Sequence, residues 1–293
     1  KGLILPLANA REAAVVEEIE VYGVNNIMEV ISLLNGTSSI KPVEISKYEE
    51  ESDDIYAFDF ADVRGQENIK RALEVSAAGS HNVILIGSPG SGKTMLAKRL
   101  PTIMPPMTLK EALETTKIHS VVGMVSNGTS LLKTRPFRSP HHTTSYVGLV
   151  GGGAYPQPGE ISLAHNGVLF LDELPEFKRN VLEVLRQPME DRMVTIARAK
   201  QTIEFPANFM LVAAMNPCPC GYYNHPTQEC SCQPGSVEKY LNKISGPLLD
   251  RIDLHIEVVP VPFEELTKKT PGEKSSEVRA RVTRARKIQT ERF

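Results

Sequence analysis

The chain has 293 residues, enough for about two domains, and its 41% apolar and 23% charged residues are typical of globular proteins. Its longest apolar runs fall well short of the ~18 residues of a membrane-spanning helix, so no transmembrane segment is predicted. A net charge of −2 excludes a strongly basic nucleic-acid-binding chain, but the charge is uneven. Residues 1–60 carry 4 basic and 12 acidic side chains, and residues 61–293 carry 29 and 23, so a polyanion-binding surface is expected in the later part.

The cysteine pattern and the N-terminus indicate a piece of a longer cytoplasmic protein. All four cysteines lie in one short segment, at 218, 220, 230 and 232, unlike the spread framework of a small secreted domain. The chain begins Lys1-Gly2-Leu3, with neither an initiator Met nor a signal-peptide pattern. We therefore expect a fragment that works in the cytoplasm.

The first part of the chain alternates helix and strand signals. Helices are predicted over Asn9–Glu18 and Asn26–Asn35, on either side of a short strand at Ile19–Val21. The second helix is expected to stop at Asn35-Gly36, a common C-cap pair. Residues 37–58 are rich in Ser, Glu and Asp and predict an acidic linker.

The later part of the chain has an α/β pattern. From Phe60 to Pro262, apolar strand-like runs alternate with helix-like segments, which predicts a domain built around a mostly parallel sheet. An Arg-rich helix is predicted over Ser276–Arg292. Its arginines at 279, 281, 284 and 286 are interpreted as a solvated face.

A phosphate-binding loop is the sharpest motif. The apolar run Val83–Ile86 leads into Gly87-Ser88-Pro89-Gly90-Ser91-Gly92-Lys93-Thr94, which matches GxxxxGKT, and then into the helix-like Met95–Leu100. Glycines let such a loop turn its backbone N–H groups around an anion, at the positive end of the following helix. Lys93 is expected to reach the β- and γ-phosphates and the Thr94 hydroxyl to ligate Mg²⁺.

Two further apolar strands end in polar residues suited to the same site. Val168–Leu171 is followed by Asp172, which can hold Mg²⁺ through water, and by Glu173, which can deprotonate an attacking water. Met210–Met215 is followed by Asn216, which can bond both phosphate and water. Taken alone, Asp172-Glu173 would be interpreted as a helix N-cap and Asn216-Pro217 as a turn. Together with the GxxxxGKT loop, they favour a hydrolytic site.

These three segments resemble the Walker A, Walker B and sensor-1 elements of AAA+ ATPases. Asp62–Gln66 is similar to the segment that contacts adenine in that superfamily. The resemblance implies ATP and Mg²⁺ as ligands, with Lys93, Glu173 and Asn216 in catalysis. The implied nucleotide contacts are Gly65, Gln66, Ser88, Pro89, Gly90, Ser91, Gly92, Lys93, Thr94 and Leu96.

Two insertions narrow the branch of the superfamily. Gly148–Gly167 is too rich in Gly and Pro for a simple crossover helix. Met193–Ala197 and Gln201–Phe205 flank Arg198-Ala199-Lys200, which predicts a hairpin with a basic tip. These features resemble the branch with the magnesium-chelatase motor subunits and the MCM helicases. Arg198 and Lys200 are the candidate DNA contacts.

A closer resemblance is to the ComM/YifB family of Mg-chelatase-like ATPases. It is carried by Phe137–His142, by Gly148–Gly167 with Glu173–Phe177, and by Gly246–Asp253. The implied fold is an α/β P-loop NTPase, an AAA+ core with a helix-2-type insertion and a pre-sensor-1 hairpin. The implied domains are the end of a Lon-protease-like domain (1–36), the acidic linker (37–58), the ATPase domain (59–262) and the start of a C-terminal helical lid (263–293).

The family resemblance also implies a ring, most simply a hexamer, in which Arg251 reaches the γ-phosphate of the neighbouring subunit. The alternative for Arg251 is a local salt bridge with Asp250 or Asp253. The sensor-2 arginine of the family is expected beyond Phe293.

The cysteine cluster has two open interpretations. Cys218, Cys220, Cys230 and Cys232 suit a tetrahedral thiolate Zn²⁺ site, although Cys-x-Cys is a less typical spacing than Cys-x₂-Cys. The alternative is a reduced loop or adventitious pairing.

The adjacent His141 and His142 do not share a face of a helix or strand and are interpreted as loop hydrogen-bonding residues.

The leading functional hypothesis is an ATP-driven ring that moves on single-stranded or branched DNA, a branch-migration motor supporting natural transformation. The alternative is a chelatase-type ATPase that remodels a partner protein. A nucleotide-gated scaffold ranks last, because Lys93, Asp172 and Glu173 are all present. No membrane partner is expected.

Overall fold

The computed structural model describes residues 2–14, 19–43, 56–125, 131–197, 202–261 and 272–292. The chain divides into two compact units, Lys1–Ser52 with Thr108–Lys133 and Asp53–Met107 with Thr134–Phe293. The break after Ser52 falls in the predicted acidic linker. Residues 108–133, which the sequence analysis assigns to the ATPase domain, group with the first unit. The predicted domain bounds remain predictions.

The first unit contains a two-stranded parallel sheet. Its strands β1 (Gly2–Pro6) and β2 (Glu20–Val24) pair from Gly2 with Glu20 to Pro6 with Val24, and α1 (Leu7–Ala13) connects to the end of β1. The helix packs closely on β2, since a Cβ at Gly23 would lie 2.7 Å from the Cβ of Ala10. The predicted Asn9–Glu18 helix overlaps α1, which begins earlier, and its last four residues lie outside the described ranges.

Side-chain caps mark the starts of two further helices among the described residues of this unit. In α2 (Ile27–Leu34) the side chain of Asn26 accepts a hydrogen bond from the Glu29 N–H at 3.1 Å, so the predicted Asn26–Asn35 helix is confirmed to within one residue at each end. In α5 (Leu109–Val121) the side chains of Thr108 and Glu111 cap each other's backbone N–H groups.

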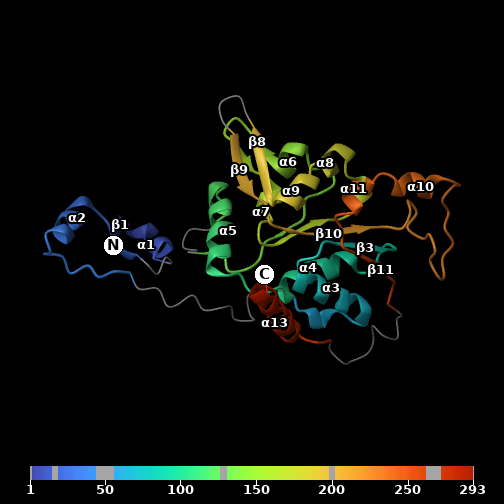
Figure 1. Ribbon diagram of the computed structural model, residues 1–293, viewed down its shortest axis with the longest axis horizontal. Coiled ribbons are helices and arrows are strands. Elements are labelled where there is room, and N and C mark those ends of the chain that lie inside the picture. Colours follow the sequence, from blue (N-terminus) through green and yellow to red (C-terminus); the bar gives the residue numbers. More distant parts are fainter. Residues whose placement is uncertain are drawn as a thin grey trace. The chain divides into compact units, whose positions relative to one another are not determined.

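The second unit is built on a five-stranded parallel sheet in the order β11-β3-β10-β7-β4 (Figure 1). Its strands are β3 (Val83–Gly87), β4 (Phe137–Arg138), β7 (Val168–Leu171), β10 (Met210–Met215) and β11 (Leu254–Val258). In the central three, Val212 of β10 lies opposite Val83 on one side and Phe170 on the other. The three strands predicted to be neighbours are therefore neighbours, and the expected α/β P-loop NTPase fold is confirmed.

Helices cover both faces of this sheet. One face carries α3 (Glu67–Gly79), α4 (Lys93–Ile103) and α13 (Ser275–Arg292), and the other carries the shorter helices (Figure 1). The shorter helices are α6 (Tyr146–Val150), α7 (Glu160–Leu163), α8 (Arg179–Glu183), α9 (Arg186–Asp191), α10 (Ser236–Leu241) and α11 (Gly246–Leu249), with the 3₁₀ turn η3 (Leu174–Glu176). The 3₁₀ turn η2 (Phe60–Asp62) packs on the first face, where Phe60 joins the core under α3 and α4.

Alternation along the strands divides the apolar side chains between two cores. Val168 and Phe170 pack toward α3, α4 and α13, whereas Leu169 and Leu171 pack toward the shorter helices. Strand β10 alternates in the same way, with Val212 in the first core. Because both faces are buried, these strands have to be apolar throughout, which is why their sequences predict them so clearly.

Both predicted insertions are present. Residues 148–167 form α6, the small antiparallel pair β5 (Gly151–Gly152) and β6 (Gln157–Pro158), and α7. The hairpin consists of β8 (Met193–Ala197) and β9 (Thr202–Pro206), one residue later in its second strand than predicted. Its tip, with Arg198 and Lys200, lies outside the described residues.

The arginines of α13 correct one expectation. Arg281 pairs with Glu74 of α3, with a 2.7 Å bond from Nε, and also with Glu273. Arg286 donates to the backbone oxygen of Ala77 at 2.9 Å and bonds Ser80. The hydrogen bond from Arg281 also lowers the pKa of Glu74. These two residues dock α13 on α3, so the helix does not present a wholly solvated arginine face.

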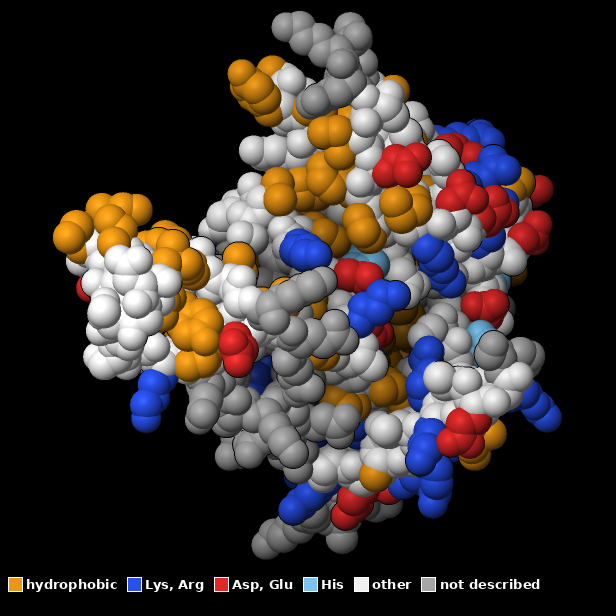
Figure 2. All heavy atoms as spheres, turned by 60° about the vertical axis from the view of Figure 1, so that its left-hand side comes forward, with side chains coloured by type: hydrophobic (Ala, Val, Ile, Leu, Met, Phe, Trp, Pro, Cys, Tyr) orange, Lys and Arg blue, Asp and Glu red, His pale blue; other side chains and the backbone are white. Residues whose placement is uncertain are grey.

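Surface charge shows no single sign. In the face seen in Figure 2, Lys and Arg side chains are interspersed with Asp and Glu. This agrees with the near-neutral net charge of the chain.

Asn82 joins the starts of three strands. Just before β3, its Nδ2 donates to the Arg251 backbone oxygen (2.9 Å), and its Oδ1 accepts from the Leu211 N–H of β10 (2.8 Å). Its own N–H donates to the carboxylate of Asp253 at 2.8 Å.

We expect Asn82→Ala to lower the free energy of unfolding by about 2–3 kcal/mol, because it leaves a buried N–H of Leu211 without its acceptor. Urea unfolding followed by circular dichroism measures this. Asn68→Ala, the same substitution at an exposed position of α3, serves as the control and should stay within ~0.5 kcal/mol of wild type. Equal stability of the two variants would contradict the assignment.

Candidate nucleotide-binding site

The carboxyl ends of β3, β7 and β10 bring together four side chains that were predicted from three separate motifs. Lys93 Nζ donates to the backbone oxygens of Gly87 (2.8 Å) and Ser88 (2.9 Å) and to Oδ1 of Asn216 (3.2 Å). Thr94 Oγ1 donates to Oδ2 of Asp172 at 2.7 Å. Parallel strands end at one edge of the sheet, so residues more than a hundred positions apart meet at this point.

The loop between β3 and α4 has the conformation of a phosphate cradle. Gly90 and Gly92 have φ of +77° and +95°, in the left-handed region that favours glycine. Lys93 is only 8% exposed, and this burial lowers the pKa of its ammonium group, while nearby Asp172 opposes the shift. The ammonium group is thus enclosed by loop carbonyls that phosphate oxygens can replace.

Buried hydroxyl groups in the loop fit a polyphosphate. The Oγ atoms of Ser88 and Ser91 are buried and have no hydrogen-bond partner among the described residues. Buried polar atoms are normally paired, so two unpaired donors in one glycine-rich loop point to a ligand rich in acceptor oxygens. The Thr94 hydroxyl and the Asp172 carboxylate are the oxygen donors that Mg²⁺ prefers, and the residues present fit both ATP and Mg²⁺.

A second part of the candidate site lies beside the start of α3. Gly65 and Gln66 both have positive φ, and Gln66 Nε2 donates to the backbone oxygens of Ser91 (3.1 Å) and Val259 (3.2 Å). They line a cavity of about 440 Å³ with Ile69, Val259 and Pro260 among its other walls. The apolar part of this lining, next to a backbone-anchored amide, suits a flat heteroaromatic ring, and Glu67, Asn68 and Glu257 make the rest of the lining polar.

Glu173 has a partner that the sequence did not indicate. His142 Nδ1 lies 3.2 Å from Glu173 Oε2, and the His142 ring makes an edge contact with Phe177 at 6.4 Å between centroids. Glu173 itself has φ of +53°, an uncommon conformation for a residue with a side chain. His141 bonds Thr143 at 2.9 Å, as interpreted from sequence, but His142 reaches across to the end of β7. His142 lies soon after β4, which pairs with β7, and because β4 is not predicted from sequence, no local signal pointed to this contact.

Arg251 is engaged within its own chain. It bonds Glu190 of α9 and the backbone oxygen of Pro247, and its side chain is 23% exposed. The alternative partners predicted from sequence were Asp250 and Asp253, so the observed partner is a different acid. A role toward a neighbouring subunit remains a prediction.

Leu96 lies apart from the polar cluster. Its side chain is fully buried in the core beneath the loop, with Leu85 and Val212 in the same cluster.

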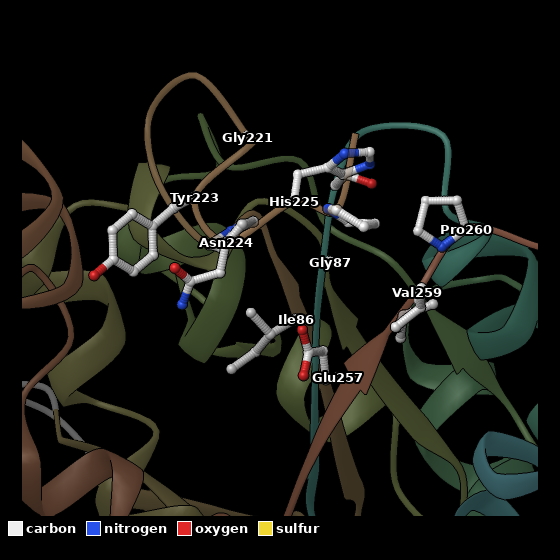
Figure 3. Close-up of a pocket in the computed structure, with 13 residues that line it drawn as sticks. Ile86, Gly87, Gly221, Tyr223, Asn224, His225, Glu257, Val259 and Pro260 are labelled. Carbon is white, nitrogen blue, oxygen red and sulfur yellow. The ribbon is translucent and has the colours of Figure 1, made fainter. Parts of the chain in front are cut away.

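A smaller cavity of about 290 Å³ adjoins the loop (Figure 3). Tyr223, Asn224 and His225 lie on one side of the end of β3, and Val259 and Pro260 lie on the other. The segment after Asn216 therefore forms a wall next to Gly87 and Ser88.

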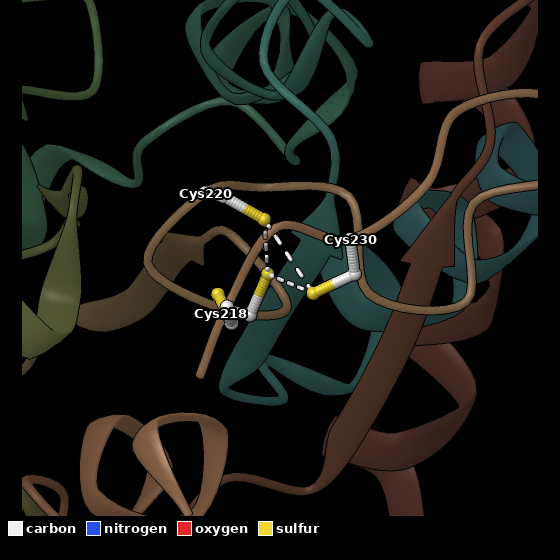
Figure 4. Close-up of side chains that lie close together, drawn as sticks. Cys218, Cys220 and Cys230 are labelled. Carbon is white, nitrogen blue, oxygen red and sulfur yellow. Dashed lines mark hydrogen bonds between the residues drawn. The ribbon is translucent and has the colours of Figure 1, made fainter. Parts of the chain in front are cut away.

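The four cysteines of this segment converge. All four Sγ atoms lie within 4.8 Å of one another, and the three labelled in Figure 4 are 3.3, 3.5 and 3.8 Å apart. The cysteines are free rather than disulfide-bonded. A backbone hydrogen bond from Tyr222 and the thiols around it hold the pKa of Cys220 at about 5.

Comparison with known proteins agrees with this geometry. A family model described as magnesium chelatase, subunit ChlI, matches residues 59–266. The competence protein ComM of Haemophilus influenzae is 47% identical over 296 residues, covering 100% of this chain and 57% of that protein. The Escherichia coli protein YifB is 52% identical over 239 residues, 80% of this chain and 46% of its own length.

A more distant relative is the magnesium-chelatase 38 kDa subunit of Rhodobacter capsulatus, 27% identical over 180 residues, 55% of this chain and 50% of the subunit. The chain spans about half the length of these curated relatives.

We expect His142 to position Glu173 for the hydrolysis of a bound nucleoside triphosphate. In His142→Ala, kcat should fall about 10-fold, less than the ~10²–10⁴-fold loss expected when a general base is removed, with KM unchanged. His142→Asn, which can still donate to the carboxylate, should recover part of the rate. Steady-state phosphate release measures both parameters.

The matched control is His141→Ala, which removes the adjacent ring but not the contact with Glu173. A wild-type kcat in His142→Ala, or equal losses in the two alanine variants, would contradict the positioning role.

Proposed function

The chain belongs to the magnesium chelatase subunit ChlI family, in its ComM/YifB group, and from this premise we propose that it is the motor part of an ATP-hydrolysing ring that acts on DNA. The observation that carries the proposal is the convergence of Lys93, Asn216 and the Thr94–Asp172 pair at one edge of the sheet. A Mg-chelatase-like AAA+ chain with this cluster has the parts that hydrolysis needs.

The proposed hydrolysis assigns a task to each side chain. Lys93 exchanges its loop carbonyls for β- and γ-phosphate oxygens, while Ser88, Ser91 and the loop N–H groups donate to the same anion. Thr94 and Asp172 would hold Mg²⁺, which supplies positive charge to the phosphates when bound. Glu173, oriented by His142, takes the proton of the attacking water, and Asn216 bonds that water or the γ-phosphate.

A ring assembly supplies the remaining positive charge. Arg251 follows α11 in the segment that resembles the arginine-finger element, and in the ring it would turn from Glu190 to the γ-phosphate of the adjacent subunit. An arginine supplied in this way stabilises charge in the transition state of phosphoryl transfer. We propose a hexamer.

DNA is the proposed substrate for three reasons. Residues 61–293 carry six more basic than acidic side chains, Arg198 and Lys200 lie in the sequence between β8 and β9, and a relative that is 47% identical is named a competence protein. The mixed surface charge in Figure 2 is compatible with this, because a ring repeats a few basic contacts per subunit and gains avidity from the repetition. Branch migration during natural transformation is the activity we assign.

A partner protein is the second candidate substrate. It is favoured by the similarity to a magnesium-chelatase subunit. In either case we place the protein in the cytoplasm, where ATP is available. Within the described ranges, no helix is both long and apolar enough to cross a membrane.

The DNA proposal predicts DNA-stimulated ATP hydrolysis. Single-stranded or branched DNA should raise kcat several-fold at low salt, and the stimulation should decline as salt rises, because phosphate contacts release counterions. Coupled-enzyme assays over a salt series measure it, with Glu173→Gln as the control for contaminating ATPases. Turnover that responds to a partner protein and not to DNA would favour the second candidate.

The ring proposal predicts that Arg251→Ala lowers kcat by ~10³-fold while the Kd for ATP stays within about twofold of wild type. Glu190→Ala breaks the same intrachain pair but keeps the arginine, so it should retain turnover. If the two variants lose activity equally, Arg251 serves only the intrachain contact.

A further inference from the structure

The segment between Asn216 and α10 has no core of its own. Residues 217–235, all of which the structure describes, contain no helix or strand, and only Cys218 and Gly221 among them are buried. A long irregular segment held in one conformation needs a substitute for apolar packing. The four cysteines are the groups in it that gather at one point.

The sulfur geometry matches a metal rather than disulfide bonds. In a tetrahedral site with Zn–S bonds of ~2.3 Å, neighbouring sulfur atoms are ~3.8 Å apart, whereas a disulfide needs ~2.05 Å. The three separations of 3.3, 3.5 and 3.8 Å between Cys218, Cys220 and Cys230 lie near the first value. The Gly221 N–H also donates to Cys218 Sγ at 3.2 Å, a bond that a thiolate accepts well.

The same loop touches the phosphate-binding loop. Gly221 has φ of +88°, and a Cβ placed there would lie 2.5 Å from Cδ of Pro89. Cys218 is only two residues beyond Asn216, which bonds Lys93. The wall of the 290 Å³ cavity beside Gly87 and Ser88 comes from this loop as well (Figure 3). A group that fixes the sulfur atoms therefore fixes Asn216 and Gly221 against Lys93 and Pro89.

We propose that Cys218, Cys220, Cys230 and Cys232 bind one Zn²⁺ as thiolates and that the metal clasps this loop onto the ATP site. Binding displaces to solvent the protons that the thiols still carry and leaves a closed site with no open position, which is a structural rather than a catalytic zinc site. The metal half of the proposal, that the four thiolates bind zinc, does not depend on the proposed function. The clasp half, that zinc holds the loop against the ATP site, rests on the proposed ATP binding. Occupancy of the metal site sets the affinity for nucleotide.

Metal analysis of the full chain, purified without chelator, tests the metal half. We expect one zinc per chain, released in full when a mercurial reagent titrates four thiols. Cobalt substitution should give the intense thiolate-to-metal charge-transfer absorption of a sulfur-ligated site. Cys218→Ser with Cys230→Ser should lose the zinc, while Ser231→Ala, which keeps all four thiols, should retain it.

Zinc-free or iron-loaded wild-type protein would overturn the assignment, as would zinc that the double variant retains. The mercurial titration uses wild-type protein, so it decides the question even if the double variant does not fold.

A fluorescent-nucleotide titration tests the clasp half. Zinc-stripped wild-type protein should bind ATP about 10-fold more weakly than the loaded protein, a usual coupling between two sites, with Mg²⁺ equal in both samples. Adding zinc back should restore the affinity. Equal affinity with and without zinc would overturn the clasp, and no ATP binding in either sample would overturn the proposed function and leave the zinc stoichiometry intact.

Discussion

Parallel pairing of β3, β10 and β7 is the constraint on which the candidate site depends. The three strands run in the same direction, so their carboxyl ends lie at one edge of the sheet. The residues that follow the strands therefore lie close together. A slip of one residue in β10 would exchange its two faces, moving Val212 out of one core and Ala213 out of the other. The burial of both faces therefore fixes the register that brings Asn216 to Lys93.

The parts of the fold and of the site that could be predicted from sequence are those that a short stretch of the chain determines. The GxxxxGKT loop, the apolar strands β3, β7 and β10, and the end of α2 at Asn35 are each encoded within a dozen residues, and they are where expected. Strands β4 and β11 were not predicted individually. The first is only Phe137–Arg138, and the second alternates exposed and partly buried residues along the edge of the sheet.

The contacts that sequence missed are long-range pairs of charged or titratable side chains. Whether His142 faces Glu173, or Arg281 faces Glu74, depends on the docking of elements far apart in the chain. An arginine-rich helix has the same local pattern whether it is solvated or docked, so α13 is indistinguishable by composition from an exposed helix. The convergence of the cysteines also depends on the path of the loop between them. Their spacing in the sequence is compatible with both a metal site and a reduced loop.

In the ring we propose, the pairing of Arg251 with Glu190 would matter before the subunits assemble. A bare guanidinium at a subunit edge attracts any polyanion in the cell, and its neutralisation by a carboxylate of the same chain screens that attraction. Release from Glu190 would then require a stronger anion close by, such as a triphosphate bound to an adjacent copy in the proposed ring. If the ring forms as proposed, the pair would keep a lone subunit from binding other anions through Arg251 and leave the guanidinium free to act between subunits.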